Sequence, residues 1–256
     1  MDAVEAYKEA LERRGRTRKE AALRREQRYI ADKIRHNQSY HRVLIDGEPQ
    51  MVSIANSDNL NEKMIFSMPN EDLRHGAYVE WMDNHWLITE RDANTTVYTR
   101  CKMIQCNYLL RWVNDRDEIC EIWAIVEDGT KYLTGEFDDR IFMATRGDTR
   151  LSMTLSRTPE TLKFNRQSRF IIDDPASQEQ LAYALSKPLR MGMTYNDNGV
   201  FKFVMQEVVT TDDDNLELRI ADYYKHFPRD YTVDATVGDI PATATTDTRN
   251  GRKNWL

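Results

Sequence analysis

The sequence predicts a mainly β protein, in which basic N-terminal helices precede two small antiparallel β-barrel or sandwich units and an extended C-terminal tail. From Lys63 to Val113, apolar and aromatic residues alternate with polar ones, as in half-buried strands. Tight-turn pairs interrupt this alternation at short intervals, and helix-start signals precede it. We therefore divide the chain into a basic helical arm (1–36), a first β-barrel domain (37–127), a second β domain (128–226) and an extended polar tail (227–256).

The arm is predicted to form two helices, which are separated by a break at Gly15. Thr17 with Glu20, and Asp2 with Glu5, have the spacing of a capping box, in which a side-chain oxygen accepts a hydrogen bond from the N3 amide. In the second helix, one narrow stripe holds the apolar side chains Leu23, Tyr29, Ile30 and Ile34. The arginines that face elsewhere are candidate interaction residues: Arg24, Arg25 and Arg28.

Charge is divided unevenly along the chain. Residues 1–36 contain eleven Lys and Arg against seven Asp and Glu, a balance of +4. Because the net charge of the chain is −6, the other 220 residues carry −10. A solvated helix that packs on its own domain explains such an arm, and so does a helix that docks on an acidic neighbouring subunit or on nucleic acid. The acidic body argues against sequence-specific DNA binding, which depends on phosphate neutralisation.

The first β region begins after Asn37. Asp46-Gly47 lies between two alternating segments, and because both residues tolerate positive φ, the pair predicts a hairpin. A second hinge is expected at Asp83-Asn84. The predicted strands are His41–Ile45, Gln50–Ile54, Met64–Phe66, Ala77–Met82, Trp86–Glu90, Val97–Val113 and Ile119–Val126. Many short strands with tight turns are typical of a small antiparallel barrel or sandwich.

The second β region runs from about Lys131 to Tyr224. Its predicted strands include Leu151–Leu155, Phe170–Ile172 and Val200–Val208, and its predicted turns are Arg146-Gly147-Asp148, Asp173-Asp174-Pro175 and Asn196–Gly199. The last turn resembles a calcium loop only superficially, because the later glutamate is missing, so we interpret it as a hairpin turn. Beyond His226 the chain becomes polar and aperiodic, and it closes on Trp255-Leu256. This end is interpreted either as a frayed terminus or as a tethered anchor for a partner groove.

Known catalytic patterns are missing from the sequence, which favours a protein that is not an enzyme and needs no cofactor. The five histidines and three cysteines have no HxH, HExxH or CxxC spacing, so a zinc site is not predicted. Asp212-Asp213-Asp214 is interpreted as a solvated turn rather than a cation site. No apolar stretch approaches the roughly 20 residues of a membrane span. The chain has an odd number of cysteines and begins without an apolar signal segment. Both features predict synthesis in a reducing cytoplasm.

Several segments resemble head-closure and head–tail connector proteins of tailed phages that infect Gram-positive bacteria. These segments are Asp58–Pro69, Gly76–Glu80, His85–Thr89, Gln105–Trp112, Val126–Tyr132 and Lys187–Leu189, within a resemblance that spans about Thr17 to Tyr224. The resemblance implies a structural virion protein of the phage neck, made in the bacterial host cytoplasm. It implies a homo-oligomeric ring that connects the portal or adaptor protein to the tail proteins and helps to close the channel after DNA packaging. Packaged DNA would pass nearby without sequence-specific binding.

Two polar loops, Asn56–Asn61 and Met68–Gly76, are candidates for a conformationally free segment that plugs such a channel. The alternative function is a β-barrel binding module, whose exposed aromatics, such as Tyr78, Trp81 or Trp86, stack on glycans or single-stranded nucleic acid. Burial of Trp86 would count against that module, and two exposed Trp faces beside Arg91 or Arg100 would favour it.

Overall fold

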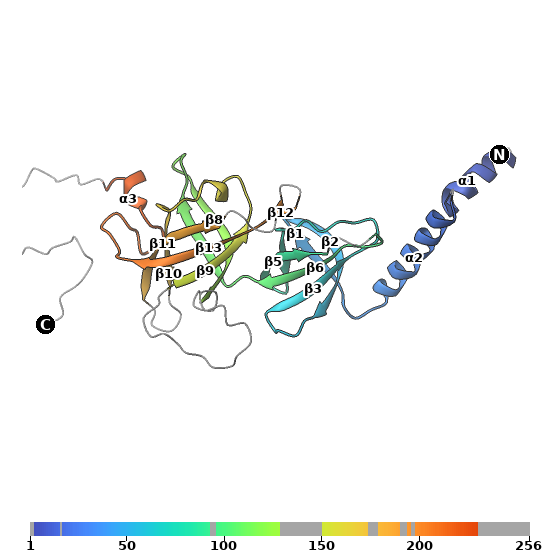
Figure 1. The fold of residues 1–256 in the computed structure, drawn as a ribbon, viewed down its shortest axis with the longest axis horizontal. Coiled ribbons are helices and arrows are strands. Elements are labelled where there is room, and N and C mark those ends of the chain that lie inside the picture. Colours follow the sequence, from blue (N-terminus) through green and yellow to red (C-terminus); the bar gives the residue numbers. More distant parts are fainter. Residues whose placement is uncertain are drawn as a thin grey trace, which may run out of the picture.

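The computed structural model confirms a mainly β fold with N-terminal helices and two barrel-like units. The structure describes residues 3–15, 17–92, 96–128, 150–173, 179–189, 194–195 and 198–229. Helices, barrels and the last described segment follow one another along the longest axis (Figure 1). The predicted turns at 146–148 and 174–175, and the tail with Trp255 and Leu256, lie outside the described residues.

The helical arm consists of α1 (Ala3–Arg14) and α2 (Arg18–Arg35), and Figure 1 shows it leaving the first barrel as a rod. Gly15 separates the two helices with φ at +96°, which confirms the predicted break. Thr17 is the N-cap of α2, because its side-chain oxygen accepts a hydrogen bond from the Glu20 amide at 3.1 Å. The capping prediction at this helix is therefore confirmed.

The first barrel is closed and has the strand order β1-β2-β3-β6-β5-β4. Its strands are β1 (Tyr40–Ile45), β2 (Glu48–Asn56), β3 (Glu62–Ser67), β4 (Tyr78–Trp81), β5 (Asn84–Arg91) and β6 (Arg100–Gln105). Asp46 and Gly47 both have positive φ between β1 and β2, which confirms the predicted hairpin. The next hairpin turns at Met82 and Asp83, one residue earlier than expected, and Asn84 already pairs with Trp81.

The second unit is an antiparallel sheet with the order β10-β11-β13-β9-β8-β7, joined by the short strand β12. Its strands are β7 (Tyr108–Val113), β8 (Ile119–Asp128), β9 (Arg150–Ser156), β10 (Arg169–Asp173), β11 (Gln180–Leu189), β12 (Thr194–Tyr195) and β13 (Asn198–Val208). The Tyr108 hydroxyl donates to the Ile171 carbonyl at 3.0 Å and so links the two outer strands, β7 and β10. The sheet is therefore a nearly closed barrel. Tyr195 pairs with Asn198, as a hairpin at 196–199 requires.

The boundary between the sheets differs from the predicted one. Instead of one strand from Val97 to Val113, β6 and β7 are separate, and β7 and β8 pair with the second sheet although residues up to 127 were assigned to the first domain. Asn107 makes the break, because its side-chain oxygen accepts from the Val126 amide and its side-chain nitrogen donates to the Val126 carbonyl. An asparagine that replaces backbone partners in this way moves the chain from one sheet to the other.

Each barrel has its own apolar core. The first core is formed by Val43, Ile45, Val52, Ile54, Ile65, Leu73, Ala77, Val79, Trp86, Ile88, Cys101 and Met103. The second is rich in aromatic side chains and contains Trp112, Phe164, Phe170, Tyr183, Phe201 and Phe203 with Leu110, Ala124, Met153, Leu155, Ile172, Leu185 and Met205. A short 3-10 helix, η2 (Thr161–Lys163), leads Phe164 into this core, where its ring meets the rings of Trp112 and Phe170 edge to face.

A third apolar cluster joins the barrels. Leu87, Cys106, Ile125 and Val200 are buried between them, and the partly buried Trp123 packs there. β5 is therefore covered on both faces, since Trp86 and Ile88 face the first core and Leu87 faces the junction. Burial on both faces joins the two units into one body.

Polar contacts complete the junction. The Tyr78 hydroxyl donates to the Trp123 carbonyl at 2.5 Å and accepts from the Ser156 amide at 3.3 Å. The Ser156 hydroxyl donates to the Gly76 carbonyl at 2.6 Å, and the rings of His85 and Trp123 stack at 4.3 Å. Burial raises the pKa of Tyr78 well above its usual range, so this hydroxyl stays a donor at physiological pH.

Candidate functional site: the helical arm and its groove

Helix α2 carries the candidate interaction residues, and none of its 18 residues is buried. Leu23, Ile30 and Ile34 lie on one stripe and are only half-buried, and Tyr29 is 66% exposed. A helix in a folded domain normally covers such a stripe with its own core. Within the described chain, α2 has an apolar stripe without a core beneath it.

Arginines flank this stripe. Arg24 is half-buried, Arg25 and Arg28 are exposed, and Arg35 follows at the end of the helix. Over the whole of α2, seven Lys and Arg stand against three Asp and Glu, a balance of +4. Since the rest of the chain is acidic, this helix is the part best suited electrostatically to meet another copy of the body.

A groove of about 690 Å³ separates α2 from the first barrel. Arg24, Arg28 and Arg35 form its basic wall, and its opposite wall is formed by Tyr40, Met51, Met68, Pro69, Asn70 and Glu71. A hydrogen bond from the Gln27 side-chain amide to the Asn70 side-chain oxygen, 3.0 Å long, crosses the groove. The groove thus combines guanidinium groups with methionines, which adapt easily to different apolar partners.

The opposite side of α2 near its end is polar. The His36 ring Nδ1–H donates to the Asp32 carbonyl at 2.8 Å, and the Lys33 ammonium lies 5.9 Å from the Tyr29 ring centroid. Both contacts join residues of one helical turn and are exposed. They stabilise the helix end only slightly, because exposed pairs of this kind contribute little.

Of the two candidate plugging loops, Met68–Gly76 is packed rather than free. Leu73 is fully buried in the first core, His75 is 4% exposed, and the His75 ring nitrogen bonds the Thr89 carbonyl at 2.8 Å. The Ser67 hydroxyl donates to the Glu71 carbonyl at 2.9 Å. The expectation of a conformationally free loop is therefore wrong here, since this segment covers the barrel interior. Asn56–Asn61 is a short β2–β3 connection with Leu60 88% exposed.

Two of the four described tryptophans are core residues. Trp86 is 4% exposed and Trp112 is 9% exposed, and each belongs to the core of its barrel. Trp81 is partly buried, with its ring 5.8 Å from that of Trp86. Two open indole faces beside Arg91 or Arg100, the arrangement expected of a stacking module, do not occur among the described residues.

Among the described residues, no three or more His, Cys, Asp or Glu side chains are grouped so that they could hold a metal ion. Asp212, Asp213 and Asp214 diverge: the first is exposed, and the last is buried against Arg169. Cys101 and Cys106 are buried free thiols, and burial raises the pKa of each to about 12. No helix in the described ranges is long and apolar enough to cross a membrane.

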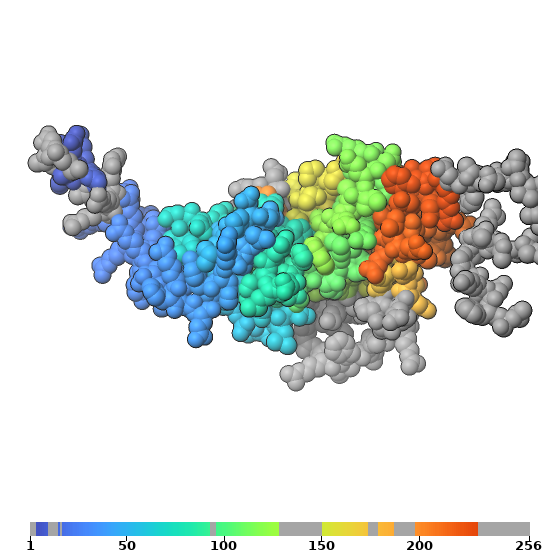
Figure 2. Space-filling model, turned by 180° about the vertical axis from the view of Figure 1, so that it is seen from behind, coloured from blue at the N-terminus to red at the C-terminus, as the bar shows by residue number. Residues whose placement is uncertain are grey.

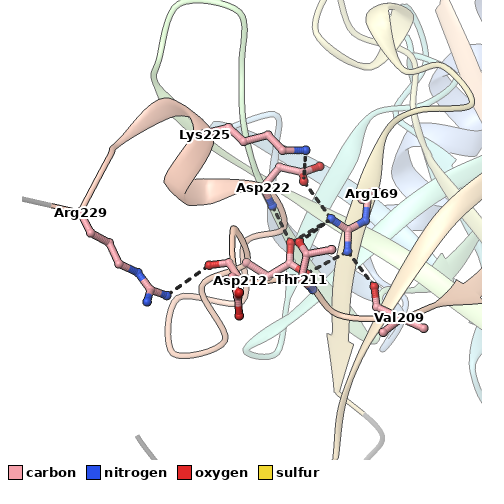
Figure 3. A network of polar contacts seen from close by, with 8 residues as sticks. Arg169, Val209, Thr211, Asp212, Asp222, Lys225 and Arg229 are labelled. Atoms are coloured by element: carbon pink, nitrogen blue, oxygen red, sulfur yellow. Dashed lines mark hydrogen bonds and ion pairs between the residues drawn. The ribbon is translucent and has the colours of Figure 1, made fainter. Parts of the chain in front are cut away.

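An ionic network that no sequence pattern indicated holds the segment after β13 against the second barrel (Figure 3). Arg169 donates to both carboxylate oxygens of Asp214 at 3.1 and 2.8 Å, to Asp222 at 2.8 Å and to the Val209 carbonyl at 3.1 Å. Asp214 also accepts from the backbone amides of Thr211 and Asp222. We call this network the Arg169 clasp. The partners lie 40 to 53 positions from Arg169 along the chain, which is too far for local sequence patterns to reveal the network.

Comparison with known families gives a match that covers α2 and the first barrel. Residues 18–105 match the family described as the YomX N-terminal domain. These bounds coincide with the start of α2 and the end of β6, so the match contains the candidate surface and excludes the second sheet. No curated protein and no solved structure matches the chain.

Proposed function

We propose that this protein is a structural component of the neck of a tailed bacteriophage, which self-associates through its helical arm into a ring between the head and the tail. In this role it joins the portal or adaptor protein to tail proteins, helps to close the DNA channel, and performs no catalysis. The main observation behind the proposal is that α2 has an apolar stripe and basic flanks but no buried residue.

The body suits a role under mechanical stress. A buried apolar cluster and the Tyr78, Ser156 and His85 contacts fix the two barrels to each other. A ring subunit must hold its shape while its neighbours and the packaged DNA press on it, and two barrels fixed as one body meet that need. The acidic charge of the body would repel DNA passing through a channel rather than hold it.

The resemblance to connector proteins supports the same role. Its main segments coincide with β3, β4 and β5 of the first barrel and with β7, the first strand of the second sheet. The YomX N-terminal domain match adds α2 to that barrel as one unit. The helix and the barrel between them form the groove, so the unit includes both of its walls.

The alternative, a stacking module for glycans or single-stranded nucleic acid, has less support. It needs open aromatic faces, and Trp86 and Trp112 are instead within the cores.

The test is binding to the portal protein encoded in the same genome. The purified full chain is sedimented alone and after mixing with assembled portal rings, beside a variant with Leu23, Ile30 and Ile34 changed to Asn. We expect the unmodified chain to sediment with the portal as a complex of defined mass, and the variant to bind weakly. A folded chain that ignores the portal but retards single-stranded DNA would overturn the proposal.

A further inference from the structure

The end of the body opposite the arm presents a rigid apolar and acidic segment, residues 209–218. Figure 2 shows that the N-terminal helices and the segment after β13 occupy opposite ends of the described chain. Within this segment, Val209 is 85% exposed, Leu216 is 41% exposed and Leu218 is 36% exposed. It contains four acidic residues and no Lys or Arg. We call it the distal knob.

The distal knob is held in place by contacts that leave its apolar side chains at least partly exposed. The Arg169 clasp holds the carbonyl of Val209 and the carboxylate of Asp214, whose side chain is 1% exposed. Asn215 and Ile220 pair as an isolated bridge, and the Asn215 side-chain oxygen accepts from the Leu218 amide at 3.0 Å. Leu216 and Leu218 therefore lie, partly exposed, on a turn whose backbone is held by these bonds.

Rigid presentation of exposed leucines is characteristic of binding surfaces. A buried Arg–Asp pair is a weak device for stability alone, because the desolvation of both ions offsets much of their attraction. Ordering a loop in its bound shape, in contrast, lowers the entropy lost on association. The geometry of the clasp fits the second purpose, since it orders a segment that contributes no large apolar side chain between Val209 and Leu218 to either barrel core.

The arm offers the complementary surface. The distal knob has Leu216 and Leu218 beside exposed Asp212 and Glu217, and α2 has its apolar stripe beside Arg24 and Arg28. If the two surfaces met, apolar groups would face apolar groups, and carboxylates would face the guanidinium groups that line the groove. We propose that the distal knob of one copy docks on the α2 stripe and groove of the next copy.

This contact would be heterologous, because the two surfaces differ and lie at opposite ends of one chain (Figure 2). Repeated head-to-tail contacts close into a ring if the rotation between neighbours closes, and otherwise extend into a filament. The inference rests on the proposed self-association and specifies which two surfaces make it.

A cysteine trap tests the pairing on the full chain. One preparation carries Ile30→Cys and a second, with a different tag, carries Leu218→Cys; both carry Cys120→Ser, because Cys120 is the partly exposed natural thiol. After mixing and mild oxidation, we expect mixed-tag disulfide dimers. The matched control replaces Leu218→Cys with Leu60→Cys, a more exposed position on the first barrel, and should give few mixed dimers. Equal yields from both mixtures would overturn the proposal.

Charge reversal supplies a second readout. Asp212→Lys with Glu217→Lys should weaken self-association about tenfold or more, and adding Arg24→Glu with Arg28→Glu to the same chain should restore it. Retained assembly with the reversed knob would overturn the distal contact while the ring proposal stands. Absence of any self-association by the unmodified chain would overturn both.

Discussion

Gly76 lies against the backbone of Gly199 at the junction of the two barrels, and a side chain at position 76 would collide with that backbone. A Cβ built on Gly76 would lie less than 3.0 Å from the carbonyl group of Gly199. Gly76 also has φ at +81°, and its carbonyl accepts from the Ser156 hydroxyl. The two backbones approach this closely because glycine permits it.

We therefore predict that Gly76→Ala destabilises the protein by about 2–4 kcal/mol, since it combines a left-handed backbone with a steric clash at the junction. Gly47→Ala is the matched control, because Gly47 has φ at +84° but no atom within 4 Å of an added Cβ. That control should cost only about 1 kcal/mol. Urea unfolding of both variants measures the difference, and equal losses would mean that the barrels do not rely on this contact.

The Arg169 clasp should be essential for the last described segment. Asp214→Asn leaves Arg169 without its main partner in a site where the aspartate side chain is 1% exposed, so we expect a loss of about 3–5 kcal/mol in the free energy of unfolding. Lys225→Ala removes an exposed ion pair to Asp222 in the same network and should cost less than about 1 kcal/mol. Hydrogen exchange of residues 209–226 reports the opening directly. Unchanged protection in Asp214→Asn would contradict the clasp.

The helical arm should separate assembly from stability. Changing Leu23, Ile30 and Ile34 to Asn removes apolar groups that no core covers, so the urea midpoint should shift little, by about 0.5 kcal/mol or less per site. Self-association should be lost at the same time. A large drop in stability with unchanged mass would show that α2 packs on its own barrel and has no part in assembly.

Stability should fall at high pH through the two buried thiols. Burial raises the pKa of Cys101 and Cys106 to about 12, and an unfolded thiol titrates near 8.5. The folded thiols therefore keep their protons to a higher pH than the unfolded ones. Their contribution to the free energy of unfolding is intact below about pH 8.5 and is lost as the pH rises toward 12. Each thiol contributes a slope of up to about 1.4 kcal/mol per pH unit.

Urea unfolding of the wild type and of Cys106→Ala between pH 8 and 10.5 tests this slope. The difference between the two pH profiles reports the Cys106 thiol together with its electrostatic effect on Tyr78. Parallel pH profiles would contradict its burial.

Local patterns predicted much of the fold because they record local physics. Asp46-Gly47 adopts the positive φ values of a tight hairpin, and Thr17 caps α2 through its own side chain. The second hinge moved from Asp83-Asn84 to Met82-Asp83 because the Asn84 side chain donates to the Met82 carbonyl at 2.7 Å and Asn84 joins β5. Such one-residue choices depend on side-chain contacts that a hydrophobic pattern does not encode.

Long-range pairing was not predictable from the same patterns. Residues 108–127 were predicted to form strands. They belong to the second sheet because Asn107 bonds Val126 and because β8 pairs with β9. No local pattern marks Arg169, because its partners lie 40 to 53 positions away along the chain. Arg24, Arg25 and Arg28 were recognisable because a helix places them at a known spacing from its apolar stripe.

The most direct test of the account is the mass of the full chain in solution, measured by light scattering over a wide concentration range at moderate ionic strength. The account predicts a discrete species at a multiple of 30.1 kDa that dissociates when the salt concentration rises or when the α2 stripe is removed. A folded 30.1 kDa monomer at every concentration, alone and with the portal protein, would contradict it.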